Sequence, residues 1–145
     1  MLDRTICYPE CGGQPGDIGF LGNWKILGTL KANDGDSIHI VEKNCSLKEG
    51  DTVHLILDWE HRYKYMIMHL CQHLISGLLF NVLHIGTVAV HLGEDYFTIE
   101  TDRGSIEDSE IEILMTQTEK AIVEGHRVKY HEMTHSQAES LGMRR

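Results

Sequence analysis

The first 58 residues alternate between short apolar segments and glycine-rich turns. The segments 24–31, 37–42 and 52–58 have the alternating pattern typical of β-strands. The stretches between them, 32–36 and 43–51, have strong turn compositions. Their spacing predicts a small antiparallel sheet or partial barrel in this part of the chain.

From Trp59 the apolar positions follow a helical period instead. They recur in steps of three and four and predict one buried stripe, made of Tyr63, Ile67, Leu70, Leu74 and Leu78. His69 and His73 are four residues apart, so on a helix they share one line with Arg62 and Met66. That line flanks the apolar stripe, which is a position that suits the wall of a cleft.

After this helix, the pattern predicts a hairpin over 87–102 with its turn at 92–95. A second helix is expected from about residue 105, with Ser105 and Asp108 as its capping box and Gly125 at its end. Its buried stripe is expected at Ile111, Leu114, Thr118, Ala121 and Ile122. The segment 127–133 reads as a strand, and 134–142 as a short helix with Thr134 and Gln137 as the cap pair and Gly142 at its end.

The pattern therefore predicts an α+β fold in two parts, residues 1–58 and residues 59–145. The first is a small, glycine-containing, β-rich and barrel-like part. It is expected to pack on a second part, a two-layer arrangement of helices and strands that contains the histidine helix.

The composition narrows the possible functions. The net charge is −9, with 22 acidic and 13 basic residues, which argues against a general nucleic-acid-binding protein. A local basic patch stays possible, with Arg62 and Lys64 before the histidine pair and Arg127, Lys129, Arg144 and Arg145 near the end. The alternative is that these are scattered solvated charges.

The sequence also predicts where the protein is located and whether its cysteines form disulfides. No apolar run approaches the eighteen or so residues of a membrane span, and no secretory signal is readable, so we expect a cytoplasmic protein without a membrane partner. The four cysteines lack C-x-x-C spacing, which favours buried or half-buried thiols over disulfides. Cys7 and Cys11 are expected to serve packing.

A histidine pair at this spacing can place two ring nitrogens on one metal ion, usually tetrahedral Zn²⁺. A structural zinc site needs four protein ligands, and a catalytic site needs three with a water. Cys71 points to another face of the helix, and the general-base Glu of an H-E-x-x-H peptidase is absent. The spacing alone leaves open whether the pair binds a metal or is two half-buried helix histidines.

Four segments resemble, in order, the editing domain of alanyl-tRNA synthetase and its freestanding AlaX-type relatives. This family contains the second additional domain shared by threonyl- and alanyl-tRNA synthetases. The segments are "YPECGGQPGDIG" at 8–19, "DWEHRYKYMIMHLCQHLISGLL" at 58–79, "TVAVHLGEDYFTIETD" at 87–102 and "EMTHSQAESLG" at 132–142. They cover nearly the whole chain in register.

The resemblance implies a zinc-dependent hydrolase that acts in trans, without ATP. Its substrate would be the acceptor end of alanine tRNA mischarged with serine or glycine. His69 and His73 would be the first two zinc ligands. The family takes the other two from a C-x-x-x-H motif after the last segment, and this sequence has none. We therefore expect an incomplete zinc site, which could be empty, in an editing part truncated at its C-terminus.

Other interpretations stay open alongside this one. The chain could be a fragment or degenerate homologue that acts as a binding or interaction module. His131 and His135 also have a four-residue spacing and are a further possibility for the missing ligands.

The resemblance also assigns site residues. Gln14, Thr87 and His91 are expected at the catalytic centre, with Thr87 reading the hydroxyl of serine. Gly12, Gly13 and Arg62 are expected to contact substrate. The alternatives are a tight turn for the two glycines, a structural amide for Gln14, an ordinary strand threonine for Thr87 and a surface histidine for His91. The choice between serine and glycine, the role of the metal and the oligomeric state stay open.

Overall fold

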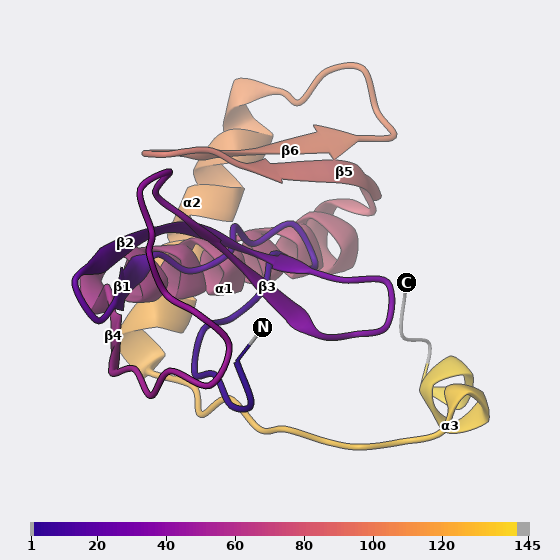
Figure 1. Ribbon diagram of the computed structural model, residues 1–145. Helices are drawn as coiled ribbons and strands as arrows, with labels where there is room; N and C mark the ends of the chain where they lie inside the picture. The colour runs from indigo at the N-terminus through magenta and orange to yellow at the C-terminus, as the bar shows by residue number, and fades with distance from the viewer. Residues whose placement is uncertain (1, 142–145) are drawn as a thin grey trace.

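The computed structural model describes residues 2–141, with three helices and six strands (Figure 1). The expected positions Gly142, Arg144 and Arg145 lie outside the described residues. Antiparallel sheets and helices alternate along the chain, which confirms the predicted α+β class.

The N-terminal sheet has four antiparallel strands in the order β3-β2-β1-β4. Their bounds are Gly19–Leu21 (β1), Trp24–Lys31 (β2), Ser37–Val41 (β3) and Leu55–Leu57 (β4). The pattern correctly located β2 and β3, but it missed β1 and made β4 too long. Three-residue strands carry too few alternating positions to stand out from the glycines around them.

A small apolar core holds this sheet together. Cys7, Leu21 and Ile26 are buried at its centre. Half-buried apolar side chains close around them, namely Leu2, Val41, Leu47, Val53, Leu55 and Leu57. Cys7 therefore packs as expected, whereas Cys11 is exposed and does not.

The long helix α1 (Trp59–Leu83) crosses behind this sheet (Figure 1). Asp58 caps its N-terminus by accepting a hydrogen bond from the His61 N–H at 3.0 Å. At its other end, His84 takes a left-handed conformation with φ 56°.

The expected buried stripe of α1 is wrong at three of its five positions, and the other two, Leu74 and Leu78, are half-buried. Its buried residues are Tyr65, Gln72 and Leu79, whereas Tyr63, Ile67 and Leu70 are about half exposed (51%, 47% and 54%). Apolar side chains occur on several faces of this helix, so their spacing alone does not identify the face that packs.

The length and composition of α1 also meet the usual criterion for a membrane span. Its most apolar 18-residue window has a mean hydropathy of 1.5, and 11% of that window is buried. One such helix is weak support for a membrane protein, because core helices of soluble proteins meet the same criterion. The absence of a membrane partner stays a prediction.

A two-stranded antiparallel hairpin, β5 (Thr87–Leu92) and β6 (Phe97–Thr101), packs against α1. Its turn lies at residues 93–96, where the Gly93 N–H donates to the Tyr96 carbonyl at 2.9 Å. The predicted hairpin is confirmed.

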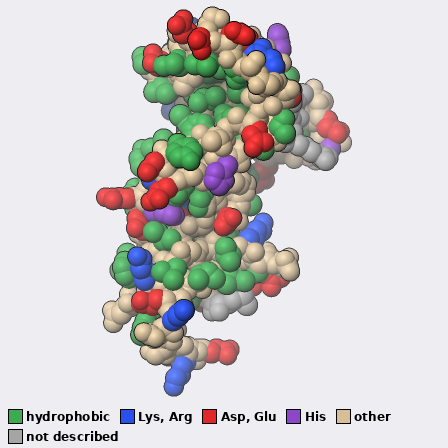
Figure 2. Space-filling model, turned by 90° about the horizontal axis from the view of Figure 1, so that it is seen from above, with side chains coloured by type: hydrophobic (Ala, Val, Ile, Leu, Met, Phe, Trp, Pro, Cys, Tyr) green, Lys and Arg blue, Asp and Glu red, His purple; other side chains and the backbone are tan. Residues whose placement is uncertain are grey.

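The second helix, α2 (Asp108–Glu124), also packs on α1 and ends at Gly125 as predicted. Its capping box joins Glu107 and Glu110, so the predicted box at Ser105 and Asp108 is wrong. None of its residues is buried: Leu114, Thr118 and Ala121 are half-buried, and Ile111 and Ile122 are exposed. In the view from above, which does not mark the elements, hydrophobic side chains (green) and acidic ones (red) are interspersed on the visible face of the molecule (Figure 2).

The chain after α2 runs as an extended segment to α3 (His135–Ser140), which lies apart from the rest of the molecule (Figure 1). The Thr134–Gln137 capping pair is confirmed. Residues 127–133 form no strand and are all exposed, so that expectation is wrong. The β-rich part ends at Leu57 and α1 begins at Trp59, but the division into two domains stays a prediction.

Candidate functional site

The glycine motif forms a tight two-residue turn. Cys11 and Gln14 exchange two backbone hydrogen bonds, from the Cys11 N–H at 3.2 Å and from the Gln14 N–H at 3.0 Å. Between them Gly12 and Gly13 have φ values of +59° and +80°. Positive φ at both central positions is the requirement of a type I′ turn, and glycine meets it without steric cost.

This turn lies against the histidine helix. The side chain of Gln14 is buried at 6% exposure, and its Oε1 lies 3.1 Å from Nδ1 of His69. A Cβ placed on Gly12 would lie 3.8 Å from Cε1 of His69. The structure thus brings together Gly12, Gln14 and His69, which are up to 57 residues apart along the chain.

His69 and His73 stack on one another one helical turn apart. Their ring centroids are 4.8 Å apart and their planes differ by 27°. The two Nε2 atoms face each other at 3.0 Å. Partial burial lowers the pKa of His69, and a positive charge on His73 would lower it further. His69 therefore favours the neutral form, which is the form that binds metals.

Two imidazole nitrogens 3.0 Å apart can occupy two positions of a zinc ion. No third donor joins them within residues 2–141, where no group of three His, Cys, Asp or Glu side chains could hold a metal. His131 and His135 therefore do not complete the site. The Nδ1 atom of His135 instead lies 3.3 Å from Oε1 of Glu139.

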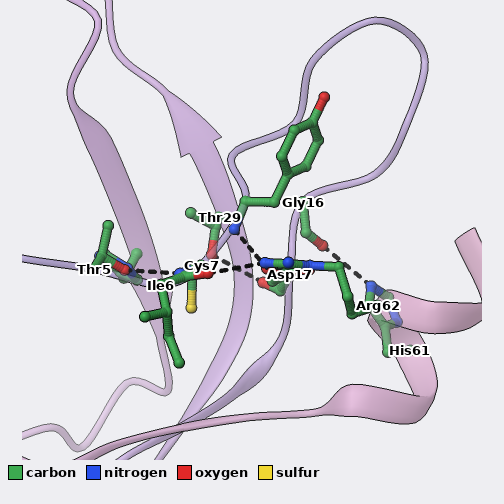
Figure 3. Close-up of polar contacts among 10 residues, drawn as sticks. Thr5, Ile6, Cys7, Gly16, Asp17, Thr29, His61 and Arg62 are labelled. Atoms are coloured by element: carbon green, nitrogen blue, oxygen red, sulfur yellow. Dashed lines mark hydrogen bonds and ion pairs between the residues drawn. The ribbon is translucent and has the colours of Figure 1, made fainter. Parts of the chain in front are cut away.

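A buried ion pair fastens the glycine motif to α1 (Figure 3). Asp17 is 1% exposed and pairs with Arg62, whose Nε donates to its Oδ1 at 2.7 Å and to its Oδ2 at 2.9 Å. The Tyr8 N–H donates to the same carboxylate at 2.5 Å. The hydrogen bonds to Asp17 raise the pKa of Arg62 above its ordinary value.

Further contacts surround this ion pair. Arg62 Nη2 donates to the Ile6 carbonyl at 2.9 Å, and His61 Nε2 lies 3.1 Å from the Gly16 carbonyl, which accepts (Figure 3). Arg62 was expected to contact substrate, and that role stays a prediction. Its contacts in the structure give it a structural role. Sequence reasoning missed Asp17, although it lies in the quoted glycine motif.

Thr87 and His91 both lie on β5, with different surroundings. The register shifts between Thr87 and Ala89, and this bulge changes which face later residues occupy. Thr87 is half-buried, and among residues 2–141 its Oγ1 is the one buried side-chain oxygen or nitrogen without a hydrogen-bond partner. His91 is exposed and pairs across the hairpin with Thr98, which is what a surface histidine would show.

Known proteins resemble this chain over most of its length. The alanyl-tRNA editing protein Aarsd1 of Danio rerio is 37% identical over 121 residues, which are 83% of this chain and 29% of that protein. The alanyl-tRNA editing protein AlaX-L of Pyrococcus horikoshii is 40% identical over 128 residues, 85% of this chain and 31% of that protein. An alanine–tRNA ligase of Pyrococcus furiosus is 32% identical over 151 aligned residues, 99% of this chain and 16% of the ligase.

No protein-family model matches the chain. The chain spans about a third of the length of the two editing proteins that it matches. The similarity to the editing proteins and to the alanine–tRNA ligase agrees with the four sequence motifs. Two of these motifs, the glycine turn and the histidine helix, lie against each other in the structure. The chain therefore belongs to the family that comprises alanyl-tRNA editing proteins and the corresponding segment of alanine–tRNA ligases.

Proposed function

We propose that this chain forms part of a hydrolase that removes serine or glycine from mischarged alanine tRNA, in trans, in the cytoplasm and without ATP. The observation that carries the proposal is the contact of Gln14 with His69, beside a glycine turn whose Gly12 lies close to the same ring. The names of the related editing proteins support the same activity.

His69 and His73 are proposed to supply two nitrogen ligands to a zinc ion. When bound, zinc would lower the pKa of a water molecule or polarise the ester carbonyl. The facing Nε2 atoms, 3.0 Å apart, support this assignment. Further ligands are not among residues 2–141.

The glycine turn is proposed to receive the aminoacyl end of the tRNA. Gly12 and Gly13 are exposed and carry no Cβ, so a substrate can approach their backbone amides closely. Amides directed at the ester oxygen would stabilise the negative charge that develops there. The exposed His91 is proposed to act at the edge of this site.

Thr87 is proposed to distinguish serine from alanine. Its Oγ1 is buried and has no hydrogen-bond partner. We propose that this atom forms a hydrogen bond with the hydroxyl of a bound serine. Alanine lacks this hydroxyl and would leave the buried Oγ1 without a partner. The site would therefore bind the alanine ester less well than the serine ester. The proposed role of Thr87 favours serine over glycine as the substrate, because glycine has no hydroxyl.

The test is a deacylation assay with alanine tRNA charged with serine, glycine or alanine. We expect release of serine, loss of that release in His69→Ala, and a selective loss of the preference for serine in Thr87→Val. His131→Ala is the matched control, because this exposed histidine lies outside the proposed site. Full activity of His69→Ala would remove the histidine pair from the mechanism.

A second candidate function is a binding or interaction module without catalysis. It is favoured by the finding that residues 2–141 supply only two metal ligands. This function predicts binding of alanine tRNA with no release of serine at any zinc concentration. A catalytic rate that rises with added zinc would exclude it.

A further inference from the structure

We propose that Gln14 is a positioning residue that holds His69 in the tautomer with its proton on Nδ1, so that Nε2 is preset as a metal ligand. The use of that ligand rests on the proposed function. The tautomer itself can be measured without metal or tRNA.

The orientation of the Gln14 amide, with its oxygen toward His69, carries the assignment of the proton. A neutral imidazole has one nitrogen that donates and one that accepts. The partner of His69 Nδ1 is the side-chain carbonyl oxygen of Gln14, at 3.1 Å, and a carbonyl oxygen only accepts. Nδ1 therefore carries the proton, and Nε2 keeps its lone pair.

The acceptor is itself held in place. Gln14 is 6% exposed, and its backbone is fixed by the two hydrogen bonds to Cys11 across the glycine turn. The same loop is fastened to α1 by the ion pair of Asp17 with Arg62. A buried side chain on an anchored loop orients a ring better than solvent could, because water would hydrogen-bond to either tautomer.

The two histidines then have different roles. Nε2 of His69 accepts, so in the metal-free protein the hydrogen bond between the two Nε2 atoms, at 3.0 Å, must be donated by His73. For a metal to bind both Nε2 atoms, the proton of His73 has to move to its Nδ1, whereas His69 needs no change. The pair thus consists of one preset ligand and one ligand that changes tautomer.

The experiment measures ¹⁵N chemical shifts of the histidine rings in the metal-free full chain, at a pH where both imidazoles are neutral. We expect the Nδ1–H tautomer for His69 and the Nε2–H tautomer for His73. Addition of Zn²⁺ should change only the tautomer of His73. An Nε2–H tautomer of His69 in the wild-type protein would overturn the proposal.

Three variants separate positioning from a general structural effect. Gln14→Leu removes the acceptor, and Gln14→Glu keeps one. Gln72→Leu is the matched control, because Gln72 is also 6% exposed and bonds to Ser76 rather than to a histidine. Gln14→Leu should lose the fixed tautomer, and Gln14→Glu and Gln72→Leu should retain it.

Zinc affinity, measured by calorimetric titration with zinc alone, gives a second readout. Gln14→Leu should weaken binding by roughly 10–100-fold, the usual effect of losing a hydrogen bond behind a metal-bound histidine. Gln14→Glu should restore wild-type affinity. An unchanged tautomer and affinity in folded Gln14→Leu would overturn the inference. Correct tautomers without deacylation would instead contradict only the proposed function.

Discussion

At the residue scale, the Asp17–Arg62 pair makes a sharp prediction about stability. Arg62→Ala leaves the carboxylate of Asp17, which is 1% exposed, without its ionic partner. Loss of one partner of a buried pair costs about 3–5 kcal/mol, because the remaining charge is uncompensated. Urea denaturation should show this decrease in the free energy of unfolding.

Lys64→Ala is the matched control for this measurement. Lys64 lies on the same helix and pairs with Asp95 at 3.0 Å, but the two side chains are 40% and 85% exposed. Exposed pairs contribute little to stability, because water and salt screen the two charges. Equal effects of the two substitutions would mean that the Asp17–Arg62 pair does not anchor the loop.

Cys7, which directly precedes the glycine motif, and Cys11, which lies within it, should differ in reactivity. Burial raises the pKa of the Cys7 thiol, so it forms less of the reactive thiolate than an ordinary cysteine at any pH below that pKa. Cys11 is exposed. Iodoacetamide at pH 8 should therefore modify Cys11 first in the native protein and both thiols in urea, as followed by mass spectrometry. Equal native rates would contradict the buried position of Cys7.

Individual residues were predictable where their chemistry is distinctive. The paired glycines, Gln14 and the histidines stand out, and the structure brings Gln14 into contact with His69 and places Gly12 close by. Asp17 did not stand out, because an acidic residue beside glycine resembles an ordinary loop residue. Its partner lies 45 positions away, and sequence spacing does not reveal such a contact.

At the scale of elements, two leucines of α1 distinguish the packed face from the apolar stripe predicted from the sequence. Leu79 is 3% exposed and Leu70 is 54% exposed. Leu79→Ala should cost about 2–5 kcal/mol in the free energy of unfolding, because it leaves a cavity. Leu70→Ala should cost well under that, roughly 1 kcal/mol or less. Thermal and urea denaturation measures the loss of stability in both variants. A larger loss for Leu70→Ala than for Leu79→Ala would support the stripe predicted from the sequence.

The errors in the predicted elements have physical causes. The capping box of α2 was placed two residues early, since Ser105–Asp108 and Glu107–Glu110 both have the required spacing and only backbone geometry separates them. The segment 127–133 alternates like a strand, but strands need a hydrogen-bonded partner, and none of the described strands pairs with it. Local patterns predicted the long helices and the hairpin well, because many residues contribute to each of those signals.

At the scale of the whole molecule, the extended segment between α2 and α3 is expected to be the first site of proteolysis. Residues 126–134 are all exposed and belong to no helix or strand. Lys25 and Arg62, in contrast, lie within β2 and α1, where cleavage requires local unfolding. Trypsin should therefore cut first after Arg127 or Lys129, as identified by mass spectrometry over time.

The body of the molecule should survive this cut. The glycine turn, α1 and the hairpin all precede residue 127, and their mutual contacts do not involve the segment that is cleaved. The His69 ring shifts should therefore stay unchanged in the cleaved protein. A variant with Arg127→Gln and Lys129→Gln should resist the early cut. An earlier cut after Lys43 or Lys48 would show that the loop before β4 opens more readily than this segment.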